Sequence, residues 1–473
     1  MPNTDSAIVV GSGPNGLAAA VVLAQAGLAV TVLEAADDIG GGTRTAELTV
    51  PGLLHDICSA VHPFGAASPV FQSLPLAEHG LEWRRPEVDL AHPLGGERAA
   101  RMYRSLEDTA AGLGADGAAW RQVFGPPAAR FADLADDILA PLLHVPHHPV
   151  SLVRFGIRAM LPATWLARRF RTDEARGLFA GIAAHVIHPL NRPGTAAAGV
   201  MLTASGHHVG WPVAAGGSHS ITKALASLLA DLGGKIETGV RVASLAELPR
   251  VGATLFDTSP STFVEIAGDR LHRRDRRQLK RWRYGPAAFK LDLAVEGGIP
   301  WSAEPCRRAG TVHVGGTIEE IAAAEADVHR GRMPERPFVL VGQQYLCDPQ
   351  RSVGDVHPVW MYAHVPQGYD GDATNLMLDQ IERFAPGTRD RIVGQHVMAP
   401  ADFAAYNPNY VGGDISTGAN TLRQLVLRPR PALDPYATGI PGVFLCSAAT
   451  PPGAGVHGMC GYHAAHAALR HLG

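Results

Sequence analysis

The chain has 473 residues, more than one ordinary domain holds, so two large domains are expected. Hydrophobic residues make up 46% of the sequence and charged residues 18%, a globular composition that excludes an intrinsically disordered chain. The formal net charge of -3 argues against a general nucleic-acid-binding protein.

The first predicted elements are a β-strand, a glycine-rich turn, a helix and a second strand. Ser6–Val10 is a β-branched run typical of a buried parallel strand, and the turn at residues 11–16 follows it directly. A helix rich in Ala, Leu and Val extends to about Ala26, and the second strand covers Ala29–Leu33. The start of this helix offers N–H groups and the positive end of its dipole to a phosphate. This order of elements predicts a dinucleotide-binding βαβ unit.

The glycines of the turn Gly11-Ser-Gly13-Pro-Asn-Gly16 have separate roles. Gly11 permits the tight turn, Gly13 lets the backbone approach a pyrophosphate, and Gly16 lets the helix pack closely on the strand. Glu34 ends the second strand, where its carboxylate would bind both ribose hydroxyls and repel a 2′-phosphate, so FAD or NAD is favoured over NADP. A second GxGxxG match, at residues 112–117, follows a predicted helix instead of a strand, and we expect a turn there.

Three features bear on the cellular compartment. The longest apolar run, residues 16–33, has nearly membrane-spanning length, but Gln25 and Gly27 divide it. The first residues lack a basic stretch followed by an apolar core, so we expect no secretory signal. Five cysteines form no CxxC pair, which indicates free thiols in a reducing compartment. We therefore predict a soluble, cytoplasmic protein.

A second glycine-rich segment follows Glu34. Gly40-Gly-Gly-Thr-Arg-Thr45, taken with the βαβ unit, resembles the FAD-binding amine oxidase and phytoene desaturase superfamily. This resemblance implies that the glycines pass close to the ribityl-pyrophosphate of the flavin and that Arg44 neutralises phosphate charge. Residues 51–63 resemble the phytoene-desaturase-like branch of the superfamily, and so does the Asn- and Gly-rich run at 407–414, which predicts a tight turn.

The C-terminal segment also resembles part of a flavin site. Residues 442–449 read as a buried strand, and a third GxGxxG match at 453–458 leads into an Ala-rich helix that ends near Leu472. A helix N-terminus in this position can bind an anionic group. The resemblance implies that the segment packs along the isoalloxazine ring and stabilises negative charge near N1 of the reduced flavin. The two ends of the chain are therefore expected to bind one FAD.

The resemblance also predicts the fold class and the domains. It implies an α/β fold with a Rossmann-type, glutathione-reductase-like FAD-binding domain and a second, mixed α+β substrate domain. The FAD-binding domain is discontinuous and comprises residues 1–90, 205–290 and 405–473. The substrate domain comprises residues 91–204 and 291–404.

The predicted cofactor-binding residues come from the two glycine-rich segments, the acidic strand end, a central segment and the C-terminal segment. They are Gly11, Gly13, Pro14, Asn15, Gly16, Glu34, Ala35, Gly41, Gly42, Thr43, Arg44, Val242, Ala448, Gly455, Val456 and His457. The backbone at Val242 is expected to approach the adenine. FAD is expected to be bound non-covalently, since no motif of the superfamily supports a covalent link to Cys446, Cys460 or His457.

The reaction expected of such a protein is substrate oxidation. A second NAD-binding βαβ unit and a cysteine pair are both missing, which argues against electron relay from NAD(P)H to a disulfide. The substrate, a small and lipophilic organic molecule, would transfer a hydride to flavin N5, lose a proton and gain a double bond, while the protein positions it and excludes water. The alternatives are a flavoprotein scaffold that binds a partner and a redox-neutral flavin isomerase.

Three residues are candidates for the general base. His62 and His457 lie in segments that the resemblance places beside the isoalloxazine, and Tyr345 lies in the apolar run Phe338–Leu346. For each, the alternative is a hydrogen-bonded residue of the cavity wall. The histidine groups at 144–148 and 463–471 come nearest to ligand spacing, but neither group itself includes a Cys or carboxylate, so no metal site is predicted.

One basic segment suggests a further partner. Residues 269–283 contain eight arginines and lysines in an otherwise slightly acidic protein, and at helical spacing Leu271, Leu279 and Trp282 share one narrow face. The segment Arg270–Arg283 therefore predicts weak peripheral contact with an anionic membrane. The alternative is that the three apolar side chains pack on the body while the arginines are solvated or paired with Asp275 and other acids.

Overall fold

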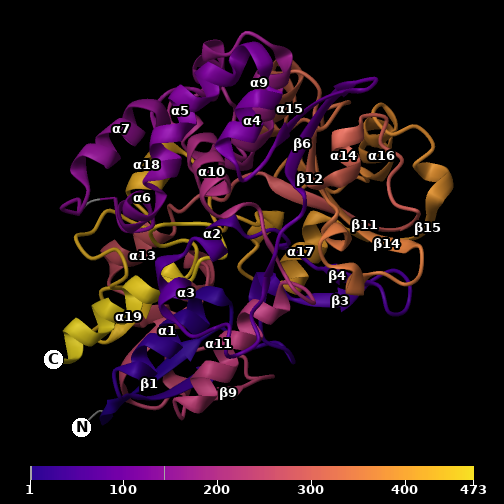
Figure 1. Cartoon of the computed structure of the whole chain (residues 1–473). Helices are drawn as coiled ribbons and strands as arrows, with labels where there is room; N and C mark the ends of the chain where they lie inside the picture. The colour runs from indigo at the N-terminus through magenta and orange to yellow at the C-terminus, as the bar shows by residue number, and fades with distance from the viewer. Residues whose placement is uncertain (1–2, 143) are drawn as a thin grey trace.

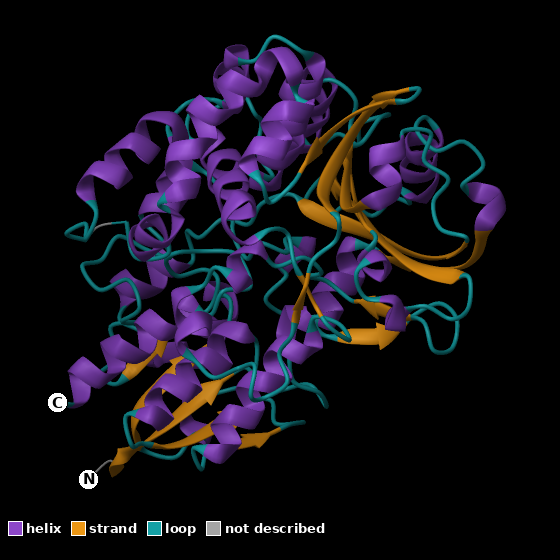
Figure 2. Cartoon of the chain, viewed as in Figure 1, coloured by secondary structure: helices purple, strands orange, loops and turns teal. Residues whose placement is uncertain are grey.

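The computed structural model describes residues 3–142 and 144–473 and contains two large β-sheets (Figures 1 and 2). One is a parallel sheet in the order β16-β10-β1-β2-β9, and the other is a mixed sheet in the order β15-β11-β14-β13-β12-β6-β7. The parallel sheet comprises β1 (Asn3–Val10), β2 (Ala29–Leu33), β9 (Lys235–Glu237), β10 (Val251–Phe256) and β16 (Val443–Leu445). The mixed sheet comprises β6 (Val88–Gly95), β7 (Arg98–Met102), β11 (Ala287–Glu296), β12 (Ala309–Val314), β13 (Val339–Gly342), β14 (Val356–Val365) and β15 (Ile392–Met398).

The predicted βαβ unit is confirmed. The apolar run at residues 16–33 is divided into helix α1 (Pro14–Gln25) and strand β2. Side chains of β1 alternate between the two faces of the sheet: Val9 packs in the hydrophobic cluster of α1, while Val10 packs in the cluster on the opposite face. Helices α11 (His219–Asp231) and α19 (Met459–Leu472) join α1 on its face, and α12 (Pro260–Ala267) and α13 (Arg273–Leu279) lie on the other. The parallel sheet is therefore buried on both faces, as the apolar strands predict.

The mixed sheet also carries helices on both faces. One face packs against a helical layer built largely from residues 106–209, and the other packs against α14 and α16 (Figure 1). The helices of these layers are α4 (Leu106–Gly112), α5 (Gly117–Ala129), α6 (Phe131–Ile138), α7 (Pro149–Ala159), α8 (Ala163–Leu166), α9 (Asp173–Ala183), α10 (Ala196–Val209), α14 (Glu304–Arg308), α15 (Ile318–His329) and α16 (Thr374–Glu382). The match at residues 112–117 lies between α4 and α5 as a turn, as predicted.

Short elements connect the two sheets. They are α2 (Pro63–Ala66), α3 (Pro69–Ser73), α17 (Pro400–Tyr406), α18 (Leu422–Val426) and the paired strands β3 (Thr45–Glu47) with β4 (Leu54–Asp56) and β5 (Trp83–Arg84) with β8 (Val213–Ala214). The mixed sheet begins at Val88 and Ala287, so two of its strands run across the predicted domain boundaries at 90/91 and 290/291. No helix in residues 3–142 or 144–473 is long and apolar enough to cross a membrane.

The packing of α19 on α1 brings the two ends of the chain together. A Cβ atom placed on Gly461 of α19 would lie 1.8 Å from the carbonyl oxygen of Asn15 in α1. Within α1, a Cβ atom on Gly16 would lie 2.1 Å from the carbonyl oxygen of Gly11. Both distances are far below any van der Waals contact, so each position requires glycine.

We expect Gly461→Ala to destabilise the protein by about 3 kcal/mol or more, because the added methyl group would force the backbones of α1 and α19 apart. Gly156→Ala is the matched control, since Gly156 also lies within a helix but no atom lies within 4 Å of its Cβ position. That change should leave stability unchanged or raise it by up to about 1 kcal/mol through helix propensity. Denaturant unfolding of both variants measures the difference, and equal stabilities would contradict the close packing.

Candidate active site

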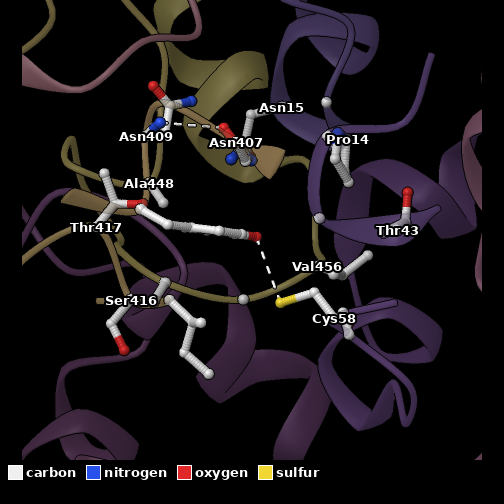
Figure 3. A pocket seen from close by; sticks show the side chains of 18 of the residues that line it. Pro14, Asn15, Thr43, Cys58, Asn407, Asn409, Ser416, Thr417, Ala448 and Val456 are labelled. Atoms are coloured by element: carbon white, nitrogen blue, oxygen red, sulfur yellow. Dashed lines mark hydrogen bonds between the residues drawn. The ribbon is translucent and has the colours of Figure 1, made fainter. Parts of the chain in front are cut away.

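One cavity of about 650 Å³ brings the predicted cofactor segments together. All of the predicted cofactor-binding residues except Gly16 and His457 line it. Figure 3 shows Pro14, Asn15 and Thr43 on one side of this pocket and Asn409, Thr417 and Ala448 on another. Its lining includes residues from the segments 10–15, 33–36, 41–44, 58–65, 240–242, 405–420 and 448–456, so the convergence of the two chain ends is a feature of the fold.

The glycine loop at the start of α1 forms the first wall of the cavity. Gly11 has a φ of 104°, a conformation that favours glycine, and its N–H donates to the carbonyl of Leu33 at 2.8 Å. A Cβ atom on Gly13 would lie 2.8 Å from Oδ2 of Asp257, and one on Gly41 would lie 3.0 Å from Cα of Gly13. Bare backbone therefore faces the cavity here, which is the surface that a pyrophosphate requires.

Asp257, at the end of β10, lies directly opposite this loop. Its Oδ2 atom accepts the N–H of Gly16 at 3.0 Å, so one of the helix N–H groups expected to be free for phosphate already has a partner. Burial raises the pKa of Asp257 to about 7, and the nearby charge of Glu34 acts in the same direction. Asp257 can therefore change its charge near neutral pH at the position where an anion would bind.

The carboxylate of Glu34 is held at the end of β2 by three donors. Oε2 accepts the backbone N–H of Ser12 at 2.9 Å and its hydroxyl at 2.6 Å, and Oε1 accepts the N–H of Ala36 at 2.9 Å. Arg44 lies 3.6 Å from Oε1. These contacts orient the acidic strand end and tie it to the glycine loop.

Arg44, in the second glycine-rich segment, folds back on the residues that precede that segment. Its Nη2 atom donates to the carbonyl of Asp38 at 2.7 Å and its Nε atom to that of Ile39 at 3.1 Å, while the guanidinium lies 5.3 Å from the centre of the Tyr406 ring. The Tyr406 hydroxyl in turn donates to the carbonyl of Gly41 at 2.6 Å. Arg44 therefore brings a fixed positive charge to the cavity wall beside Gly41 and Gly42.

His62 lines the cavity and is neutral at physiological pH. Ser218 donates its hydroxyl to the carbonyl of Ser59 at 2.7 Å, so the 2.8 Å contact between His62 Nε2 and Ser218 Oγ has the imidazole as donor. His62 Nδ1 is then the unprotonated nitrogen, 3.4 Å from the Ser59 hydroxyl. Burial lowers the pKa of His62 to about 4. The side chain is thus a fixed, neutral imidazole on the wall.

His457 and Tyr345 are not brought to the cavity. His457 is buried behind Gly455 and Val456; its Nδ1 atom accepts the N–H of Met459 at 3.1 Å, and burial lowers its pKa to about 4. Tyr345 follows β13 in a short 3-10 turn and stacks on His357 with ring centres 4.3 Å apart. Neither side chain is therefore part of the lining of this cavity, either as a base or as a wall residue.

A buried ion cluster supports the floor of the site. Arg351 is 1% exposed and pairs with Asp56 at 2.6 Å and Asp348 at 2.9 Å. Burial acts to raise the pKa of Asp56, but the Arg351 guanidinium and hydrogen bonds from Ser218 and Thr45 outweigh it and lower that pKa. The cluster joins the β3–β4 segment beneath the cavity to the loop before α11.

The far end of the cavity is apolar and aromatic. Its lining there includes Met201, Leu202, Trp211, Leu340, Trp360 and Tyr362. The polar residues among them include His185, whose Nε2 atom lies 3.0 Å from Nε2 of the buried His313. Burial lowers the pKa of His185 to about 3, so this imidazole is neutral as well. The cavity thus joins a polar, dinucleotide-like end to an apolar chamber.

Comparison with known proteins agrees with this geometry. Residues 9–74 match the family described as NAD(P)-binding Rossmann-like domain. Over 98% of its length the chain is 24% identical to pyridine nucleotide-disulfide oxidoreductase domain-containing protein 2 of Mus musculus, covering 93% of that protein. It is 25% identical, again over 98% of its length, to hydroxyneurosporene desaturase of Cereibacter sphaeroides, of which it covers 97%. The solved structure of cyclohexylamine oxidase from Brevibacterium oxydans has the same fold, with a TM-score of 0.55, 15% identity and coverage of 100% of this chain and 99% of that one.

The chain fits the amine oxidase and phytoene desaturase superfamily. That assignment confirms the resemblance seen in the glycine-rich segments and the Rossmann-type fold with a second, substrate domain. The proteins to which the chain is similar include a desaturase and an amine oxidase.

Among the polar residues of the cavity that sequence reasoning missed are Asp257, His185 and Arg428. Arg428 is buried beside the C-terminal loop, where its Nη1 atom donates to the carbonyl of Pro452 at 3.2 Å while Nε and Nη2 have no partner among the described residues. Only Asp257 has a recognisable sequence context, because it directly follows an apolar β-branched run, the run that forms β10 beside β1. His185 and Arg428 lie in segments without a recognisable motif.

We expect Arg351→Met to lower the free energy of unfolding by about 3–5 kcal/mol, because it leaves the buried Asp56 carboxylate without its cation, whereas Asp348 keeps its pairing with Arg84. The loss should be smaller at pH 4.5 than at pH 7. In the wild type the lowered pKa of Asp56 keeps it ionised over this range, whereas in the variant the unpaired Asp56 takes up a proton as pH falls. Arg98→Met is the control, since Arg98 pairs with Glu174 but is 60% exposed. Unfolding measured at both pH values tests this, and a loss independent of pH would contradict it.

Proposed function

We propose that this protein is an FAD-dependent dehydrogenase, desaturase or oxidase of a small lipophilic substrate, from which a hydride passes to flavin N5 as a double bond forms. The observation that carries the proposal is the single cavity that runs from the glycine loop and Glu34 to the apolar chamber around Trp360 and Tyr362. A dinucleotide bound along the first part would place its reactive ring at the entrance to the second. The chain's fit to a superfamily of flavin-dependent oxidoreductases supports the same function.

The residues present fit FAD. Bare backbone at Gly11, Gly13 and Gly41 would hold the pyrophosphate, and a Cβ atom at any of the three would lie within about 3 Å of another atom. Glu34 is oriented for a ribose and Arg44 adds a positive charge. Val242 would lie at the adenine end, and Ala448, Gly455 and Val456 would lie along the isoalloxazine. Bound FAD would supply the hydride acceptor.

The protein's own part in the reaction would be positioning, exclusion of water and proton removal. The aromatic and aliphatic lining of the chamber fits a substrate with an apolar body. Two neutral imidazoles line the cavity, those of His62 and His185, and they are the candidates to accept a proton from a bound substrate. Of the three general bases predicted from the sequence, only His62 lines the cavity.

Purified protein should be yellow and should release intact FAD after acid precipitation, because no covalent link is expected. Glu34→Gln and Arg44→Ala should each weaken FAD binding by about 1–3 kcal/mol, the cost of a lost charge-assisted hydrogen bond. Asp231→Ala, on the exposed side of α11, is the control. Reconstitution of apoprotein followed by fluorescence titration gives the affinities, and a folded, colourless protein that ignores added FAD would refute the cofactor.

The reaction class is tested by anaerobic mixing of the yellow protein with lipophilic amines and partly unsaturated hydrocarbons. Hydride transfer to the flavin should remove its absorbance near about 450 nm, and at saturating substrate the loss should be roughly complete. NADPH should be a poor reductant, since the chain has no second nucleotide-binding unit. Rapid bleaching by NADPH and by none of the organic substrates would favour a different oxidoreductase class.

FAD affinity should fall as pH rises from about 6 to 8, because ionised Asp257 would repel the pyrophosphate across the glycine loop. The pKa of Asp257 is about 7 in the protein, so its charge changes within this range. At pH values above that pKa, the affinity for FAD would fall by up to about tenfold per pH unit. Asp257→Asn keeps an oxygen that can accept the Gly16 N–H, yet it cannot ionise. The variant should therefore show a much flatter dependence, and identical slopes would exclude Asp257 as the titrating group.

A further inference from the structure

Helix α7 exposes an unusual amount of apolar surface. Val150, Val153, Ile157 and Met160 are between 51% and 67% exposed, and their spacing places them on one face of the helix. We call these four residues the α7 stripe. The opposite face, with Leu152 and Phe155, packs against the body. Figure 1 shows α7 at the outer edge of the molecule.

Neighbouring parts of the chain extend this apolar surface. Leu142 and Val145 precede α7, and Trp165 on α8 follows it; these side chains are 45%, 88% and 57% exposed. Seven of the thirteen large apolar side chains that are exposed in residues 3–142 and 144–473 thus fall between residues 142 and 165. Such clustering on a surface marks an interaction site, whereas single exposed apolar residues are ordinary.

The charges of the same segment are all positive. Residues 138–172 contain five arginines and no Asp or Glu, in a chain whose net charge is -3. They are Arg154, Arg158, Arg168, Arg169 and Arg171, and within the described chain none of them forms an ion pair. Arg158 donates only to backbone carbonyls, and Arg168 lies over the Trp165 ring. An exposed apolar stripe flanked by unpaired arginines and an interfacial Trp has the chemistry of a peripheral membrane contact.

The stripe also adjoins the wall of the cavity. Gly194, which lines the cavity, donates its N–H to the carbonyl of Met160 at 3.0 Å. A Cβ atom on Gly194 would lie 3.5 Å from Leu422, which is 40% exposed on α18, and Leu425 of α18 lines the cavity as well. The segment that carries the exposed apolar surface therefore contacts the cavity wall directly at Gly194.

We propose that the α7 stripe and Trp165 dock this protein on an anionic lipid bilayer. The apolar side chains enter the interfacial layer, and the five arginines lie at the level of the headgroups. Docking of this kind places the cavity wall at Gly194 against the membrane, from which a lipophilic molecule reaches the chamber without crossing water. The docking does not depend on the flavin, whereas the delivery of substrate rests on the proposed function.

The basic segment Arg270–Arg283 has the charge but lacks the exposed apolar surface. Leu271, Leu279 and Trp282 are 4%, 1% and 8% exposed, so they pack on the body, and helix α13 spans only Arg273–Leu279. Arg276 pairs with Asp269, and Asp275 pairs with Arg430. Contact through this segment would rely on charge alone, which makes it the natural comparison for the α7 stripe.

Flotation of the purified protein with vesicles tests the proposal. The wild type should float with phosphatidylcholine vesicles that contain phosphatidylserine, and less with phosphatidylcholine alone or at high salt. Val153→Ser with Ile157→Ser should reduce binding at least about tenfold, because both side chains are exposed and contribute apolar transfer energy only when docked. Arg273→Glu with Arg274→Glu, on α13, should leave binding largely intact. Thermal melting checks that both double variants remain folded.

A second measurement reports on the surface itself. Phosphatidylserine vesicles that carry brominated acyl chains should quench fluorescence in the wild type, and Trp165→Phe should lose most of that quenching. Binding that survives the Ser substitutions, or that is lost in the α13 variant alone, would overturn the proposal. So would a wild-type dimer that ignores vesicles and becomes monomeric on the Ser substitutions, since the stripe would then be a contact between two copies. All of these tests use apoprotein or holoprotein equally, so they are independent of the proposed reaction.

Discussion

Helices α1 and α19, from opposite ends of the chain, approach each other so closely that Gly461 meets the backbone of Asn15 without room for a side chain. Strands β1 and β16 lie in the same parallel sheet, with β10 between them. This arrangement places the glycine loop and the C-terminal loop at the carboxyl edge of one sheet, where open α/β folds bind ligands. The cavity exists because these two segments meet, and every other part of the site is arranged around them.

Charge then determines what the cavity can hold. Arg44 and the start of α1 favour an anion at the glycine loop, while Glu34 and Asp257 oppose one. The repulsion of an anion by these two carboxylates is reduced because Glu34 already accepts three hydrogen bonds and because burial keeps Asp257 partly protonated near neutral pH. Beneath the cavity, Arg351 and Arg84 together neutralise Asp56 and Asp348, the two carboxylates that join distant segments. The polar end therefore suits a dinucleotide whose phosphates meet the loop and whose ribose meets Glu34.

The features that sequence reasoning predicted are those with a local physical cause. Gly11 needs a positive φ, Gly16 needs contact with its own strand, and both requirements can be recognised from spacing alone. Tyr345 and His185 show the opposite case. Their sequence surroundings are equally unremarkable, yet the packing of the helical layer on the mixed sheet brings His185 to the cavity and leaves Tyr345 stacked on His357. The placement of these two side chains depends on contacts between distant segments, and no motif near either residue in the sequence predicts those contacts.

The two segments proposed for membrane contact, Arg270–Arg283 and α7, differ both in charge and in the exposure of their apolar side chains. Counting charges directs attention to Arg270–Arg283, because eight cations in a short segment are visible in the sequence. Binding to a bilayer also requires apolar side chains that no other part of the protein covers, and the fold buries those of α13 while exposing those of α7. The α7 segment has fewer cations, but none is paired with an acid, and its apolar stripe lies beside the cavity wall. Electrostatic attraction would bring either segment to an anionic surface, whereas only α7 gains further by entering it.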